Sequence, residues 1–181
     1  EPAFADLKVG IYYTPDATRQ SQFEGIFSHF ADAIYEASNG GVKIRKVTFY
    51  PNHLAGDMDL LWMNDCDTPQ TYGLIYIPGM HKDAQGQCTE QNDYATNQQQ
   101  TGYLVAHEFG HYYFHLEDAY CPRYADRNCS EPLATPYSLM TNLFNFGIFA
   151  GPSPDYRWLN FATTENYKTA SVTLPIYGQQ R

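Results

Sequence analysis

The chain has 181 residues, of which 43% are hydrophobic and 17% charged, so it is long enough to bury a sizeable core as one domain. Twenty acidic residues against eleven basic ones give a formal net charge of −9, and no basic run is present to bind a phosphate backbone, so nucleic acid is not an expected partner. No stretch approaches the roughly 18 apolar residues of a membrane span. The start at Glu1, without a methionine, leads us to expect either a mature secreted chain or a piece of a longer one.

Two strands and a long helix are predicted in the first fifty residues. Residues 7–13 (LKVGIYY) alternate in character and are rich in residues that favour strands. Residues 17–38 carry apolar side chains at helical spacing and predict an amphipathic helix that packs on a sheet. Residues 42–50 (VKIRKVTFY) predict a second strand, and their alternation slips by one near Lys46, which indicates a β-bulge.

One more strand and a polar surface segment are predicted between residues 57 and 100. Residues 57–65 fit both a short helix and an irregular segment. Residues 71–77 (TYGLIYI) predict a third strand, of the buried kind. Residues 80–100 are rich in Gln, Asn and Asp and predict a surface lobe or an edge strand with loops, in which 97–100 form a solvated loop.

The sequence HEFGH at 107–111 is the chemically most informative stretch of the chain. Its surroundings predict a buried helix over about 102–114. Residues four apart lie on one helical face, so His107 and His111 can both direct an imidazole nitrogen at one metal ion. Glu108 lies beside that ion, where a carboxylate can take a proton from a metal-bound water. This spacing predicts a catalytic zinc site.

A catalytic zinc ion takes three protein ligands, and four residues compete for the third position. On a straight helix His115 would lie about 12 Å along the axis from His107, so it can bind only if the helix ends before it. Glu131 is followed by a proline, which disfavours a helix there. Glu117 and Asp118 remain, because a chain that leaves the helix near residue 114 can bring either carboxylate back to the metal.

The four cysteines predict two disulfides in an oxidising compartment, although four reduced buried thiols are the alternative. None stands in a CxxC pair, which argues against a structural zinc or a redox site. Three pairings are possible. We expect Cys66 with Cys88 and Cys121 with Cys129, because these pairings close the shortest loops.

The chain after the helix predicts a second part of the same domain. It contains a tight turn with Met140, an apolar wall, a last helix and a short terminal strand, at residues 136–142, 144–149, 155–167 and 172–177. An ordinary core methionine is the alternative interpretation of Met140, because a single Met in a turn is weak evidence.

The motif resembles that of the metzincin-like peptidases, HExxHxxGxxH or D followed by a methionine turn. His107, Glu108, His111 and Met140 carry this likeness, and Phe114 stands where that family has its turn-making glycine. A second pattern, HExxHxxxGxxDE(Y), is found in IgA-peptidase-like bacterial enzymes and in the N-terminal domain of calcium-activated chloride channel regulators.

Against this second pattern Asp118 and Tyr120 also match, whereas His115 replaces the glycine and Ala119 replaces the acidic residue. The resemblance implies a metzincin-like zincin of the α/β (α+β) class, with a twisted mixed sheet, a long backing helix and an active-site helix. It implies one catalytic domain over 1–181, divided into an upper part (1–118) and a lower part (119–181) with the methionine turn. It also implies Asp118 as the third zinc ligand and Met140 as the floor beneath the ligands.

Three functions are consistent with these observations. The first is a secreted zinc endopeptidase, in which Glu108 activates a zinc-bound water that attacks a peptide bond of a protein, peptide or glycoprotein substrate. The second is a self-processing peptidase domain of a larger secreted protein. The third is a non-catalytic module that keeps its zinc and binds a protein or glycan, against which the intact Glu108 argues. One catalytic zinc ion is expected from the HEFGH motif, and a second metal is unsupported because the sequence has no DxDxDG calcium loop.

Overall fold

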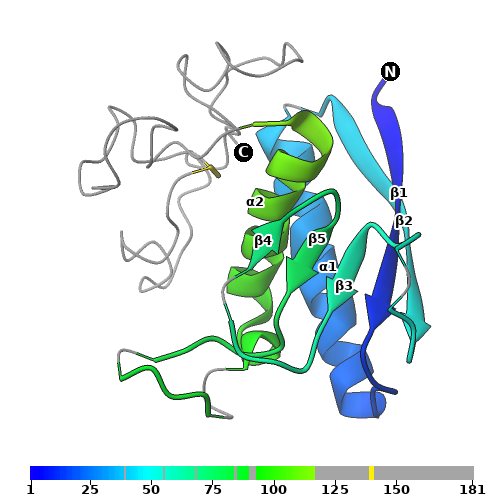
Figure 1. Cartoon of the computed structure of the whole chain (residues 1–181). Coiled ribbons are helices and arrows are strands. Elements are labelled where there is room, and N and C mark those ends of the chain that lie inside the picture. The colour runs from blue at the N-terminus through cyan, green and yellow to red at the C-terminus, as the bar shows by residue number, and fades with distance from the viewer. Residues whose placement is uncertain are drawn as a thin grey trace.

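The computed structural model describes residues 1–116, except 39, 55, 68, 84 and 90–92, together with Leu139 and Met140. These residues form a mixed five-stranded sheet and two long helices (Figure 1). The elements are β1 (Ala3–Ile11), α1 (Ala17–Ala37), β2 (Val42–Pro51), β3 (Leu60–Trp62), β4 (Gln70–Thr71), β5 (Ile75–Ile77), the short 3₁₀ helix η2 (Tyr94–Thr96) and α2 (Gln98–Phe114). Apart from Leu139 and Met140, the lower part predicted for 119–181, including its helix and terminal strand, lies outside the described residues.

The sheet has the strand order β2-β1-β3-β5-β4. Strands β2, β1, β3 and β5 run parallel, and β4 pairs antiparallel with β5. Both helices lie on one face of this sheet (Figure 1). Apolar side chains from the helices and the strands make up the core. A mostly parallel sheet with helices packed on it is the mixed α/β class predicted from the sequence.

The β-bulge predicted near Lys46 is confirmed. Ala5 pairs with Ile44 and Asp6 with Lys46, so Arg45 is the extra residue. Its guanidinium Nε donates to Asp6 Oδ1 at 2.9 Å across the strand pair. Strand β1 begins at Ala3 instead of residue 7. The sequence of residues 3–6 did not predict a strand, but these residues pair with β2 and so extend β1.

The prediction of a single strand over residues 71–77 is wrong. The chain forms β4, turns through residues 72–74 and returns antiparallel as β5. Gly73 makes the turn with a φ of 75°, a conformation that glycine enters without the steric cost of a side chain. The isolated glycine in TYGLIYI was the signal for this break.

A further strand, β3, lies within the stretch 57–65 that was ambiguous in the sequence. Leu60 and Trp62 are buried, and β3 pairs with β1 on one side and β5 on the other. Three residues are too few to show a helical or a strand period, so only the neighbouring strands define this element.

An aspartate side chain caps the start of helix α1. Helix α1 begins where the Asp16 side chain accepts a hydrogen bond from the Arg19 N–H at 2.8 Å, which caps its first turn.

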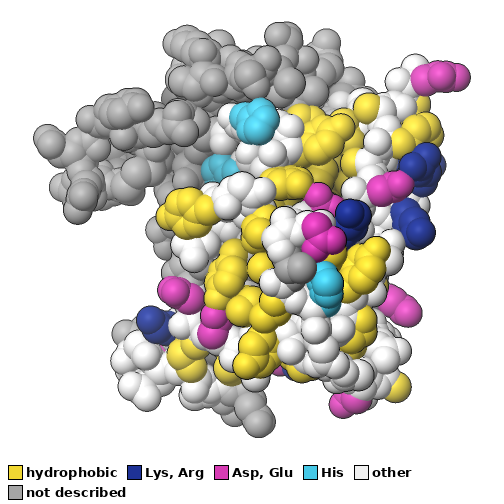
Figure 2. Space-filling view, turned by 45° about the vertical axis from the view of Figure 1, so that its right-hand side comes forward, with side chains coloured by type: hydrophobic (Ala, Val, Ile, Leu, Met, Phe, Trp, Pro, Cys, Tyr) yellow, Lys and Arg dark blue, Asp and Glu magenta, His cyan; other side chains and the backbone are white. Residues whose placement is uncertain are grey.

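Neither helix within the described ranges is long and apolar enough to cross a membrane. On the face of the described residues seen in Figure 2, Lys and Arg side chains lie among Asp and Glu side chains without a continuous basic patch.

Candidate metal and active site

Helix α2 carries the HEFGH motif and begins at Gln98, earlier than the predicted start near Gly102. The Asn97 side chain accepts a hydrogen bond from the Gln100 N–H at 3.1 Å, so residues 97–100 are a capped first turn instead of a solvated loop. The helix ends at Phe114, as predicted. His115 follows in the left-handed conformation (φ 55°, ψ 33°), at the position where the resemblance places a glycine.

Two backbone carbonyls orient the motif histidines. Nδ1 of His107 lies 2.8 Å from the carbonyl oxygen of Leu139, and Nδ1 of His111 lies 2.7 Å from that of Leu116. A carbonyl oxygen only accepts, so both Nδ1 atoms carry the hydrogen. With the hydrogen on Nδ1, the Nε2 atom of each neutral ring carries a lone pair, which is the form of histidine that binds metal.

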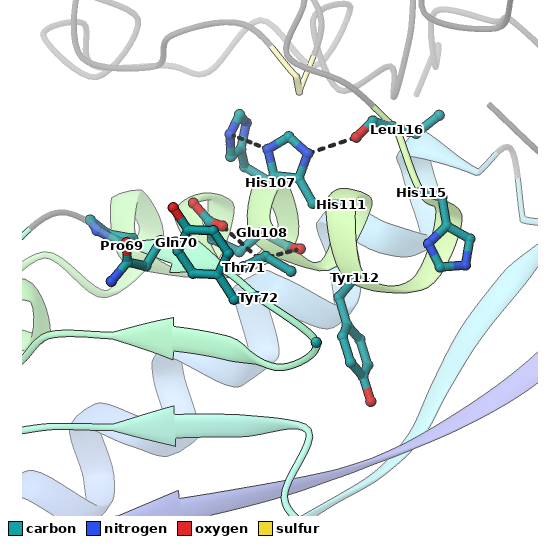
Figure 3. Close-up of a pocket in the computed structure, with 11 residues that line it drawn as sticks. Pro69, Gln70, Thr71, Tyr72, His107, Glu108, His111, Tyr112, His115 and Leu116 are labelled. Carbon is teal, nitrogen blue, oxygen red and sulfur yellow. Dashed lines mark hydrogen bonds between the residues drawn. The ribbon is translucent and has the colours of Figure 1, made fainter. Parts of the chain in front are cut away.

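The two Nε2 atoms face each other at 3.2 Å (Figure 3). Two nitrogen lone pairs this close are stabilised by a shared proton or by one cation that both nitrogens bind. Two nitrogens bound tetrahedrally to zinc at about 2.0–2.1 Å lie about 3.3 Å apart, so the observed distance fits two ligands of one zinc ion. The two histidines therefore fit two of the three ligand positions that a catalytic zinc ion would need.

The third ligand is not found among the described residues, which contain no group of three His, Cys, Asp or Glu side chains placed to hold a metal. Asp118, Glu117 and Glu131 lie outside them. His115 is described, and its ring points away from the facing imidazoles of His107 and His111 (Figure 3). The assignment of Asp118 stays a prediction, and the structure gives no support to His115 as a ligand.

Glu108 is buried, with 5% of its surface exposed, and it meets a side chain that the sequence did not single out. The hydroxyl Oγ1 of Thr71 in β4 lies 2.8 Å from Glu108 Oε2 and donates to it. No local pattern predicts this contact, because the two residues are 37 positions apart and meet only when β4 packs beside α2. Thr71 is the functional candidate that sequence reasoning missed.

A cavity of about 600 Å³ opens between the β4–β5 hairpin and the second half of α2 (Figure 3). Its polar lining includes both motif histidines and Glu108. The lining residues are Pro69, Gln70, Thr71, Tyr72, Gly73, His107, Glu108, His111, Tyr112, His115 and Leu116. The volume is in the range of cavities that hold small ligands or part of a longer one.

Tyr112 anchors the motif helix to the sheet. Its hydroxyl donates to Asp59 Oδ1 at 2.7 Å, directly before strand β3. Burial, together with the hydrogen bond and the negative charge of Asp59, raises the pKa of Tyr112 to about 12, so the hydroxyl remains a donor at neutral pH. This bond holds the helical turn that carries His111 in place against the sheet.

Leu139 and Met140 are fully buried against the core. The contact from His107 Nδ1 to the Leu139 carbonyl brings the segment with Met140 next to the motif helix. The role of Met140 as a floor beneath the zinc ligands stays a prediction.

The Cys66–Cys88 disulfide is present in the structure, with a distance of 6.1 Å between the two Cα atoms. It confirms one of the two predicted pairings. Cys121 and Cys129 lie outside the described residues, and their pairing stays a prediction.

No protein-family model, curated protein or solved structure matches this chain. The family suggested by the motif therefore stays a resemblance. The functional argument depends on the geometry around His107, Glu108 and His111.

Proposed function

We propose that this chain is a zinc-dependent endopeptidase with a metzincin-like fold. The observation that carries the proposal is the pair of Nε2 atoms 3.2 Å apart, with both Nδ1 atoms hydrogen-bonded to backbone carbonyls. Histidine ligands of a metal usually have this arrangement, in which the ring nitrogen that does not bind the metal donates its hydrogen to a carbonyl oxygen. Zinc is the metal that this ligand type and spacing favour, with Asp118 as the proposed third ligand.

Glu108 is the proposed general base and general acid. A bound zinc ion would act as a Lewis acid and make water a stronger nucleophile at neutral pH. Glu108 lies next to His107 in the sequence and lines the same cavity, so its carboxylate can accept the proton of the attacking water. The same carboxylate then gives the proton to the amine of the departing peptide fragment.

The shape of the site favours an extended peptide as substrate. Strand β4 is the outermost strand of the described sheet and lines the cavity beside Glu108. An edge strand presents backbone groups with which an extended chain can pair, and this mode of recognition depends little on the side chains of the bound peptide. A protein segment lying along β4 would have its backbone close to the motif histidines.

The finer fold assignment and the location of the protein are parts of the same proposal. A mixed sheet, the long helix α1 behind it, the motif helix α2 and the buried Met140 support a metzincin-like zincin. The Cys66–Cys88 disulfide supports a secreted or extracellular protein, because disulfides persist mainly in oxidising compartments.

The experiment that tests this function compares wild type with Glu108→Gln. We expect wild type to carry one zinc ion per chain by elemental analysis and to cleave casein. Glu108→Gln removes the proton acceptor and keeps the shape of the side chain, so cleavage should fall by about 10²–10⁴-fold while the zinc content is kept. The matched control is Glu24→Gln, an exposed glutamate on α1, which should cleave as wild type does.

Two results would contradict the proposal. One is a wild-type protein that takes up no zinc after dialysis against the metal. The other is a Glu108→Gln protein with unchanged cleavage of casein.

A further inference from the structure

We propose that Thr71 is a positioning residue that holds the Glu108 carboxylate in its working orientation, an inference that rests on the function proposed above. The Thr71 hydroxyl lies 2.8 Å from Glu108 Oε2 and 3.3 Å from the backbone oxygen of the same residue. One hydroxyl has one hydrogen to donate. Of the two oxygens, the carboxylate oxygen is the closer and the stronger acceptor. The hydrogen bond therefore runs from Thr71 to the side chain of Glu108.

The strand holds the hydroxyl rigidly. Threonine is β-branched, so its χ1 angle is restricted and Oγ1 keeps one direction. Thr71 pairs with Ile75 across the hairpin, and the Tyr72 N–H donates to the Leu74 carbonyl at 3.0 Å inside the turn. The short hairpin thus fixes the backbone from which the hydroxyl reaches α2.

Glu108 needs such a partner because helical geometry alone does not orient its carboxylate. A glutamate has three side-chain torsions, and the last one is broad and has two-fold symmetry. A hydrogen bond to one oxygen fixes that last torsion and the plane of the carboxylate. Reacting groups displaced by about 1 Å can lose about a hundredfold in rate, so a fixed carboxylate matters for proton transfer.

The bond also joins the two walls of the cavity (Figure 3). Thr71 belongs to the edge strand along which we propose that the substrate lies, and Glu108 belongs to the helix that carries the histidines. The hydroxyl is committed to Glu108, so it contributes to the chemical step more than to substrate binding. This separation predicts an effect on kcat with little effect on KM.

The test uses two substitutions that separate the hydroxyl from the shape of the side chain. Thr71→Val keeps the branched shape and removes the donor, whereas Thr71→Ser keeps the donor. We expect Thr71→Val to lower kcat for casein about ten- to a hundredfold, the range for a lost hydrogen bond to a charged group, with KM within about twofold of wild type. Thr71→Ser should recover kcat to within about fivefold of wild type.

Two readouts are independent of activity. Zinc content should equal that of wild type in both variants, because the Thr71 hydroxyl bonds to Glu108, which is not a proposed ligand. A crystal structure of metal-free Thr71→Val should show the Glu108 carboxylate rotated from its wild-type position or spread over several rotamers. If Thr71→Val does not fold, Thr71→Ser and Thr71→Ala provide the same comparison, since they differ only in the hydroxyl.

Different results would overturn the inference and the function on which it rests. Wild-type kcat in Thr71→Val, or equal losses in Thr71→Val and Thr71→Ser, would remove Thr71 from its positioning role while an inactive Glu108→Gln still supports the peptidase. Full cleavage by Glu108→Gln would instead remove the peptidase proposal itself.

Discussion

His115 ends the motif helix in a backbone conformation that few side chains adopt. Its φ of 55° lies in the left-handed region, and the N–H groups of His115 and Leu116 both donate to the Gly110 carbonyl. These bonds satisfy a carbonyl at the helix end that would otherwise lack a partner. They also turn the chain so that the Leu116 carbonyl reaches His111, which orients that histidine.

We predict that His115→Gly raises the free energy of unfolding. A residue with a Cβ pays about 1–2 kcal/mol in the left-handed region, whereas glycine does not, and the greater freedom of glycine in the unfolded chain offsets part of this gain. The expected net stabilisation is about 0.5–1 kcal/mol, measured by urea unfolding. His115→Ala is the matched control, because alanine keeps the Cβ and should bring no gain. Equal stabilisation by alanine and glycine would contradict the backbone explanation.

At the scale of elements, the crossing of α1 and α2 determines where the motif helix lies. The helices meet at Gly102, where a Cβ would lie 2.6 Å from the backbone oxygen of Ile26 and 2.9 Å from the backbone nitrogen of Phe30. Atoms of the α1 backbone therefore occupy the space that any side chain at this position would need. Glycine in the interior of α2 lets the two helices approach closely.

We predict that Gly102→Ala destabilises the fold although alanine favours helices. The gain in helix propensity is about 1 kcal/mol, whereas forcing a methyl group against backbone atoms costs about 1–3 kcal/mol and displaces the motif helix. The thermal unfolding midpoint should fall, and casein cleavage should fall with it.

Gly25→Ala on the partner helix is the control for Gly102→Ala. Its Cβ would meet the side-chain amide of Gln98, the far end of a flexible side chain that can move aside. We expect Gly25→Ala to be neutral or stabilising by up to about 1 kcal/mol. If Gly102→Ala proves as stable as Gly25→Ala, the close contact does not control the packing of the helices.

At the scale of the whole molecule, a bound zinc ion would connect α2 to the chain that follows it. The described part would supply two ligands, His107 and His111, and the proposed third one, Asp118, comes after the helix in the sequence. A metal that binds only the folded chain stabilises it by about 4 kcal/mol when its free concentration is a thousand times the Kd. Metal binding and global stability should therefore change together.

We predict that EDTA lowers the thermal unfolding midpoint of wild type and that Asp118→Ala mimics this loss. Asp118→Ala should contain less than one zinc ion per chain and respond little to EDTA. Glu117→Ala is the neighbouring control and should keep its zinc ion and its response. If Glu117→Ala loses its zinc ion and Asp118→Ala keeps it, the third ligand is Glu117 and not Asp118.

Much of the fold was predictable because its signals are local. The long helix α1, the two N-terminal strands and the bulge at Arg45 follow from periodicity over a few residues. The short strand β3 and the turn at Gly73 were missed, because a three-residue strand shows no period and an isolated glycine is a weak sign of a turn. The start of α2 was placed too late because a run of glutamines after Asn97 was interpreted as a loop.

The sequence by itself determined the motif helix and the facing histidines, because an i, i+4 pair depends only on helical geometry. The end of this helix near Phe114 was also predictable from local sequence. The tertiary structure alone decided which groups surround the motif. The Leu139 carbonyl reaches His107 from 32 residues away and Thr71 reaches Glu108 from 37. Such contacts form only when separate elements pack together, and no pattern within a single element encodes them.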